Sequence, residues 1–97
     1  MTPLHSACYH NLPDSCHMLL EAGANVRLTE RQYRQNCLHV AVSRGNLECV
    51  KVILKHHSGD KLELLQITDK DGWDCFKLVK HPQLLKYLLE FQKEENQ

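Results

Sequence analysis

The feature of this sequence that most constrains its fold is a segment that recurs 34 residues further along the chain. Leu4-His5-Ser6-Ala7 returns as Leu38-His39-Val40-Ala41, and in the same register Leu19-Leu20 returns as Ile53-Leu54. A third and looser copy follows from Asp71-Gly72-Trp73, with a longer approach and a shorter middle. Repeats of this length bury their apolar faces only against neighbouring copies, so the sequence predicts a linear stack of units.

Each copy is predicted to hold two short helices, because its apolar residues recur at three- and four-residue spacing. Thr2 and Pro3 are suited to begin the first helix, Asn11 to end it, Pro13 to begin the second helix and Gly23 to end that one. In the later copies, helices are expected over Cys37–Arg44, Leu47–Lys55, Asp74–Lys80 and Gln83–Phe91.

Polar connectors over 25–36 and 58–73 separate the predicted helix pairs. Asp71-Gly72 is a strong two-residue hairpin signal. Lys61–Leu65 is expected either to extend the preceding helix or to form a turn of its own. Short strand character is predicted around the tips of the connectors, at Val26, Leu28, Ile67 and Thr68.

Taken together, these motifs resemble the ankyrin repeat family. The resemblance is carried by Thr2-Pro3-Leu4-His5-x-Ala7-Cys8, by 37–54, by Asp69-x-x-Gly72 and by 84–89. It implies an all-α ankyrin-repeat solenoid with short β-hairpin fingers, in one domain over 1–97. The repeats would cover about 1–29, 30–65 and 66–91, and 92–97 would be a polar tail that frays.

The sequence departs from the family pattern in its first finger. Arg34 stands where a hairpin glycine is expected, and Tyr33 looks like a one-residue insertion. This longer finger is similar to a late repeat of the ankyrin inhibitors and precursors of NF-kappa-B. The long second connector is similar to insertions in that group, and equally to insertions in ankyrin-bearing ion channels.

Charge and cysteine content narrow the classes of partner. Twelve basic and 12 acidic residues give zero formal net charge, which argues against direct nucleic-acid binding and a polybasic membrane anchor. No apolar run approaches the ~20 residues of a membrane span. Five cysteines cannot all pair within one chain, and this odd number fits an intracellular compartment, cytoplasmic or nuclear.

The histidines and cysteines raise the alternative of a metal- or thiol-dependent protein. His5 and His39 could be ligands, but the resemblance implies structural histidines that tie adjacent repeats. No cysteines have finger spacing, so they are expected to pack as small apolar residues, with Cys49 the most reachable. His56-His57 would need Asp60 or Glu63 as a third ligand. No catalytic residue, cofactor or metal site is therefore predicted, and an enzyme is not expected.

The resemblance implies a non-catalytic protein-interaction module that binds a protein or peptide on its concave face, such as an inhibitor or adaptor in signalling. Trp73 is either a partner contact or packs on Leu64 or Leu65. Arg31, Arg34 and Arg44 would suit an acidic peptide. The predicted partner-binding residues are Trp73, Tyr9, His10, Arg31, Gln32, Gln35, Ser43, Arg44 and Lys70.

The first repeat raises a second alternative, in which the chain is a fragment of a larger ankyrin array with mainly intramolecular contacts. The sequence begins inside a repeat, so Leu4, Met18 and Leu19 are expected to face a preceding repeat, a partner or a second copy of the chain. Self-association through this uncapped face is the corresponding prediction for the isolated chain.

Overall fold

The computed structural model describes residues 2–57 and 60–95; Met1, 58–59 and 96–97, which include part of the second connector and of the predicted tail, lie outside the described residues. The described residues form seven helices and no β-strand. The helices are α1 (Pro3–Tyr9), α2 (Pro13–Glu21), α3 (Cys37–Arg44), α4 (Leu47–His56), α5 (Lys61–Gln66), α6 (Cys75–Leu78) and α7 (Pro82–Glu95).

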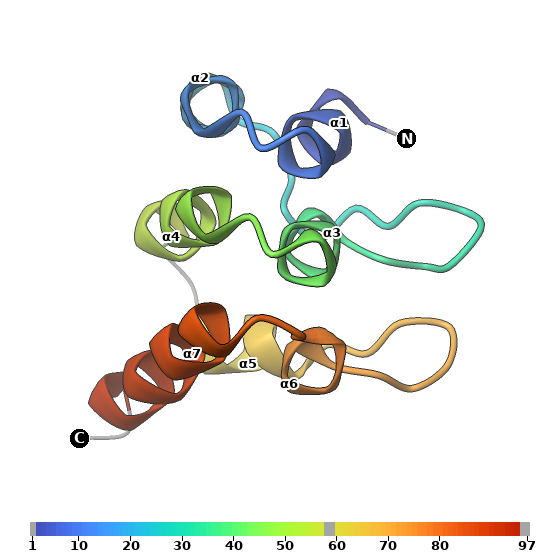
Figure 1. The fold of residues 1–97 in the computed structure, drawn as a ribbon. Helices are drawn as coiled ribbons and strands as arrows, with labels where there is room; N and C mark the ends of the chain where they lie inside the picture. Colours follow the sequence, from blue (N-terminus) through green and yellow to red (C-terminus); the bar gives the residue numbers. More distant parts are fainter. Residues whose placement is uncertain (1, 58–59, 96–97) are drawn as a thin grey trace.

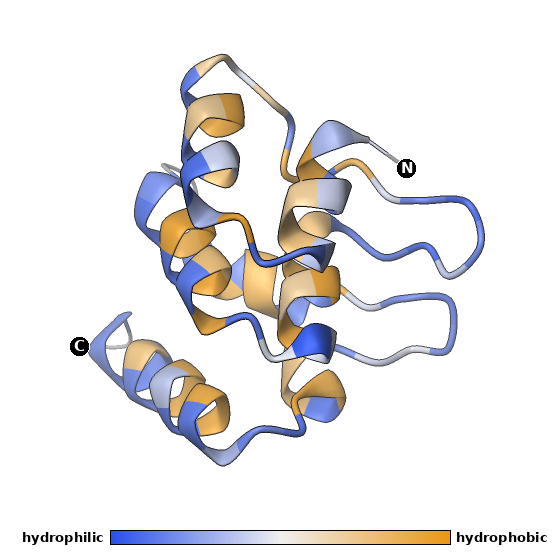
Figure 2. Cartoon of the chain, turned by 45° about the horizontal axis from the view of Figure 1, so that its top comes forward, coloured by the Kyte–Doolittle hydropathy of each residue, from blue (hydrophilic) through white to orange (hydrophobic). Residues whose placement is uncertain are grey.

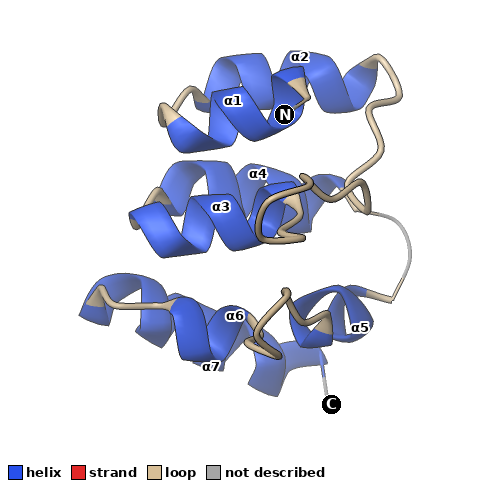
Figure 3. Ribbon diagram, turned by 90° about the vertical axis from the view of Figure 1, so that its right-hand side faces the viewer, coloured by secondary structure: helices blue, strands red, loops and turns tan. Residues whose placement is uncertain are grey.

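The helices are stacked in three tiers, which confirms the predicted solenoid. Figure 1 shows α1 and α2 in the first tier, α3 and α4 in the second, and α6 and α7 in the third. Helices α1, α3 and α6 form an inner column from which two loops project, and α2, α4 and α7 lie on the other side. The view turned by 90° shows the same three tiers (Figure 3).

Local sequence explains the helix ends of the first tier. The Thr2 hydroxyl accepts a hydrogen bond from the His5 backbone N–H, and Pro3 occupies the first turn of α1. Asn11 follows α1 in the left-handed conformation (φ 55°), and Pro13 begins α2. Gly23, also left-handed, follows the end of α2. These predicted boundaries are confirmed.

The second tier is defined by two caps on α3, whose bounds match the prediction. Asn36 caps the start: its side chain accepts from the His39 backbone N–H, and its own backbone N–H donates to the His39 ring. Gly45 ends the helix in the left-handed conformation, at φ 74°. A Cβ at Gly45 would overlap the His81 ring of the third tier, so this position requires glycine for two reasons.

The third tier differs from the prediction at both of its helices. Helix α6 ends at Leu78, because Val79 turns to an extended conformation on the approach to Pro82. Helix α7 begins at Pro82 and continues to Glu95, past the predicted end at Phe91. The residues from 92 to 95 are Gln, Lys and Glu, which favour helix, and no glycine or proline interrupts them.

The second connector contains an additional helix, α5, which is separate from α4. The Asp60 carboxylate begins it by accepting hydrogen bonds from the backbone N–H groups of Leu62 and Glu63. Leu64 and Leu65 of α5 are buried, and the helix contacts α6 and α7. The alternative of an extension of the preceding helix is therefore wrong.

The strand character predicted at Val26, Leu28, Ile67 and Thr68 is wrong: these four residues lie in turns or irregular backbone, and so do the two projecting loops. Finger loop 1 (30–35) is closed by the Glu30 N–H donating to the Gln35 carbonyl (2.9 Å). Finger loop 2 (69–73) is closed by the Asp69 N–H donating to the Trp73 carbonyl (3.0 Å). Each loop is closed by a single backbone hydrogen bond between the two residues at its ends, whereas a pair of β-strands needs a ladder of several such bonds.

The cysteines contribute to the core between the two columns of helices, where the apolar residues gather (Figure 2). All five are buried and free. The Cys16 sulfur lies 3.5 Å from that of Cys8 and 3.6 Å from that of Cys49. The expectation that Cys49 is reachable is wrong: it is 0% exposed, because α4 turns this position toward α2 and α1.

The expected apolar face of the first tier is formed only in part. Leu4 is 3% exposed, so it belongs to the core, whereas Met18 is 70% exposed. A shallow, mostly apolar hollow on this tier is lined by Leu4, Leu19, Leu28 and their neighbours.

Candidate functional site

Two buried histidines tie the tiers to the connectors that follow them. The His39 Nδ1 accepts from the Asn36 N–H, so Nε2 carries the proton and donates to the Ile67 carbonyl (2.7 Å). Burial lowers the pKa of His39 and favours this neutral form. His5 repeats the arrangement: its Nε2 lies 2.9 Å from the Gln35 carbonyl and its Nδ1 lies 2.7 Å from the Thr2 hydroxyl. These contacts are structural.

The remaining candidate metal site, at His56-His57, is not formed with either predicted third ligand, Asp60 or Glu63. His56 Nε2 lies 3.6 Å from a carboxylate oxygen of Glu21, on α2, and not beside Asp60 or Glu63. Within residues 2–57 and 60–95, no group of three or more His, Cys, Asp or Glu side chains is placed to hold a metal ion. None of the helices in these residues is long and apolar enough to cross a membrane.

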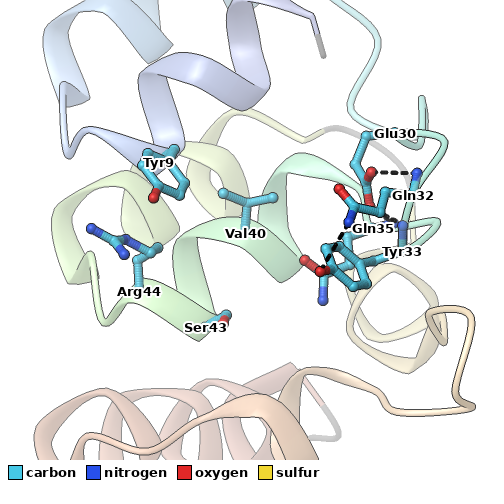
Figure 4. Close-up of a pocket in the computed structure, with 8 residues that line it drawn as sticks. All are labelled: Tyr9, Glu30, Gln32, Tyr33, Gln35, Val40, Ser43 and Arg44. Atoms are coloured by element: carbon cyan, nitrogen blue, oxygen red, sulfur yellow. Dashed lines mark hydrogen bonds between the residues drawn. The ribbon is translucent and has the colours of Figure 1, made fainter.

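A hollow lies on the inner side of the stack, between the ends of α1 and α3 and finger loop 1. It has a volume of about 160 Å³, and Figure 4 shows its lining. Helix α1 provides Tyr9, and α3 provides Val40, Ser43 and Arg44. Finger loop 1 completes the lining with Glu30, Gln32, Tyr33 and Gln35.

The helix side of the hollow is built by contacts between the first two tiers. The Arg44 guanidinium stacks over the Tyr9 ring, 4.2 Å from its centre. The Asn46 side-chain amide donates to the carbonyls of Cys8 (2.6 Å) and Tyr9 (3.3 Å), which holds the end of α1 against the second tier. This arrangement keeps Tyr9 and Arg44 together while both remain accessible at the rim.

The loop side is organised by one carboxylate. Glu30 accepts hydrogen bonds from the backbone N–H groups of Gln32 (2.7 Å), Tyr33 (2.7 Å) and Gln35 (3.2 Å). The Gln32 amide also donates to the Tyr33 hydroxyl (3.2 Å). Arg34 takes the left-handed conformation (φ 54°) that glycine would occupy more easily. The ring of Tyr33 is thereby positioned at the hollow.

Finger loop 2 repeats this design with one residue fewer. Asp69 accepts from the backbone N–H groups of Asp71 (2.9 Å) and Trp73 (3.0 Å). The longer side chain of Glu30 matches the additional residue of finger loop 1. Burial acts to raise the pKa of Asp69, but the two backbone N–H groups and the Gln35 amide outweigh it and lower that pKa.

The two finger loops are also bonded to each other. The Lys70 backbone N–H donates to the Tyr33 carbonyl (2.9 Å), and the Gln35 amide donates to the Asp69 carboxylate (3.4 Å). These bonds hold finger loop 1 against finger loop 2, and the contact of the Gln35 carbonyl with His5 Nε2 (2.9 Å) holds it against the first tier. The hollow therefore has a supported wall.

Five of the nine residues proposed from sequence lie together around the hollow: Tyr9, Gln32, Gln35, Ser43 and Arg44. The other four lie outside its lining. The His10 ring packs edge-on against that of Tyr9, while Arg31 and Lys70 are exposed on the finger loops. Trp73 is 45% exposed on finger loop 2, and Leu64 and Leu65, its alternative partners, belong to the core.

Sequence reasoning missed three lining residues, Glu30, Tyr33 and Val40. The sequence does indicate that Tyr33 is inserted, and an inserted residue at a loop tip is one that the loop must project. Glu30 aligns with Asp69 as the acid that begins the loop. Val40 sits in the repeated Leu-His-x-Ala segment, where only the packing of the next tier reveals which side it faces.

Comparison with known proteins gives two findings. A family model described as ankyrin repeats, present as three copies, matches residues 4–97. The nuclear factor NF-kappa-B p105 subunit of Gallus gallus is 30% identical over 78 residues, which cover 80% of this chain and 8% of that protein. The chain thus spans only a small part of the length of this relative.

Proposed function

Because this chain belongs to the ankyrin repeat family, we propose that it is a non-catalytic protein-interaction module that binds a partner protein or peptide on its inner face. Ankyrin repeats indicate a protein–protein interaction module. The binding face, the partner and a role as inhibitor or adaptor in signalling are the parts that we propose. Buried free cysteines support action in a reducing compartment, cytoplasmic or nuclear.

The observation that carries the proposal is the supported hollow on the inner face. Tyr9 (40% exposed) and Tyr33 (50% exposed) face it from opposite sides, and Arg44 stands at its rim. Tyrosine and arginine are the residue types that dominate protein interfaces, because they combine a large apolar area with directed hydrogen bonds. The proposed binding surface comprises the nine residues expected from the sequence, Tyr9, His10, Arg31, Gln32, Gln35, Ser43, Arg44, Lys70 and Trp73, together with Tyr33.

A second candidate is favoured by the apolar hollow of the first tier. Met18 is strongly exposed beside it, and Leu4, Leu19 and Leu28 line it. In this alternative a further repeat of a longer chain, or a second copy of this one, covers the first tier. Within the present chain we propose one domain with repeats at about 1–29, 30–65 and 66–91.

Site-directed photo-crosslinking distinguishes the two candidates. A photoreactive phenylalanine analogue replaces Tyr33 in one variant and Met18 in a second, and both are irradiated in a cell extract. We expect a covalent adduct at position 33 that excess unmodified protein suppresses, and none at position 18. Adducts at position 18 alone would refute the inner-face proposal and support a neighbouring repeat or a second copy.

A further inference from the structure

We propose that the inner hollow takes an acidic peptide segment carrying one bulky apolar side chain, an inference that rests on the proposed function and specifies its partner. The apolar side chain would enter between Tyr9 and Tyr33, above Val40. A carboxylate of the same segment would pair with Arg44.

The hollow has the size of one side chain. Its volume of about 160 Å³ is close to that of an engineered protein cavity of ~150 Å³ that binds benzene. Tyr9, Tyr33 and Val40 present apolar surface to it. A single aromatic or branched aliphatic side chain therefore fills it, whereas a whole helix or a folded loop does not.

In the described part of the chain, Arg44, the basic residue of the lining, and the cations of the finger loops form no ion pairs, whereas the acids are engaged by backbone donors. Among the described residues, Arg31, Arg34, Arg44 and Lys70 form no ion pair with a carboxylate. The Glu30 and Asp69 carboxylates, by contrast, already accept hydrogen bonds from three and two backbone N–H groups. An incoming carboxylate thus meets the unpaired Arg44 guanidinium, while the oxygens of Glu30 and Asp69 are already engaged by backbone donors.

The guanidinium of Arg44 is already oriented. The Arg44 guanidinium carbon lies 4.2 Å from the centre of the Tyr9 ring, and among the described residues the guanidinium forms no ion pair. A stacked arginine loses less side-chain entropy when it pairs with a carboxylate, and its planar edge suits bidentate pairing. On the loop side, Arg31 and Arg34 are exposed sequence neighbours of Gln32 and Tyr33 and give finger loop 1 further positive charge.

The test uses a short peptide as the probe, with acetyl-Asp-Asp-Phe-Asp-Asp-amide titrated into isotopically labelled protein and followed by NMR. We expect the largest amide shifts around Tyr9, Tyr33 and Arg44. Replacing the phenylalanine by alanine, or Arg44→Ala in the protein, should each weaken binding about 10-fold, the scale of one buried side chain or one charged hydrogen bond. Lys55→Ala, at an exposed position of α4, is the matched control and should leave binding unchanged.

Two further probes complete the test: the same peptide with lysines for aspartates, and a short oligothymidylate. Equal binding of the lysine peptide would overturn the charge argument. Tighter binding of the oligothymidylate than of the acidic peptide would mean that the hollow binds single-stranded nucleic acid rather than a peptide, and would overturn this inference. If no peptide binds but the adduct at position 33 persists, this inference fails and the proposed function stands. If no peptide binds and no adduct forms at position 33, the proposed function is refuted as well.

Discussion

The bond from His39 to the Ile67 carbonyl offers a sharp test of how the tiers are held together. His39→Asn places an amide oxygen where Nδ1 was, so the Asn36 N–H keeps an acceptor. The shorter side chain leaves the Ile67 carbonyl, 2.7 Å from Nε2 in the wild type, without its donor. The variant thus removes the bond that ties the second tier to its following connector.

The expected cost follows from the burial of the donor: His39 is 0% exposed, and Ile67 is half-buried. A carbonyl that loses its donor at such a site costs about 1–3 kcal/mol. For a domain of this size, 1 kcal/mol shifts the melting temperature by roughly 4–8 °C, so a decrease of about 10 °C is expected. Thermal unfolding followed by far-UV circular dichroism at neutral pH measures it, and urea unfolding gives the free energy.

His17→Asn is the matched control, because His17 lies on the surface of α2 and its one ion pair is exposed. It should change the free energy of unfolding by less than about 0.5 kcal/mol. His39→Gln removes the other hydrogen bond, because the longer Gln side chain can donate to the Ile67 carbonyl but cannot accept from the Asn36 N–H. If His39→Asn were as mild as His17→Asn, the argument that this histidine ties the tiers would be refuted.

Three further predictions concern proton uptake and backbone strain, each measured by urea unfolding. Burial lowers the pKa of His39 below its unfolded value of about 6.5, so the unfolded chain takes up a proton at a higher pH than the folded chain does. The free energy of unfolding should therefore decrease as the pH is lowered from about 7.5 to about 5.5. This decrease should be smaller in His39→Asn. Gly45→Ala should lower the free energy of unfolding by about 1–2 kcal/mol for its left-handed backbone and by about 0.5–1.5 kcal/mol more for displacing the His81 ring. Gly72→Ala, with open space around it, should show only the first loss. Equal losses in the two variants would contradict the packing of His81 on this cap. Arg34→Gly should stabilise the chain by about 0.5–1 kcal/mol, and destabilisation would mean that the arginine side chain contributes more than its backbone strain costs.

The features predicted correctly from sequence are those set by short-range chemistry. Thr2 caps α1 through its own side chain, and Gly23 follows the end of α2 because glycine tolerates a positive φ. The 34-residue recurrence then determines the stacking, since each tier must bury its apolar face on the next. The capping signals lie within a few residues of the helix ends that they specify, whereas the recurrence acts between tiers.

The features that were missed depend on contacts between tiers. Cys49 was expected to be reachable because Val50 and Ile53 already account for a buried stripe; α4 packs against both α1 and α2, which widens that stripe to include it. The stacking of Arg44 on Tyr9 joins residues 35 positions apart, and no local pattern indicates it. The hollow is a product of such contacts, so only part of its lining could be predicted.

The measurement that tests the central claim most directly is the affinity of a partner identified through the adduct at position 33. Isothermal titration calorimetry would compare the wild type with Arg44→Glu at the hollow and Lys55→Glu on the outer helix, two charge reversals of the same size. We predict at least about 10-fold weaker binding for Arg44→Glu, the scale of one charged contact, and wild-type affinity for Lys55→Glu. Unchanged affinity in Arg44→Glu, with binding lost in Lys55→Glu, would contradict binding at the inner face.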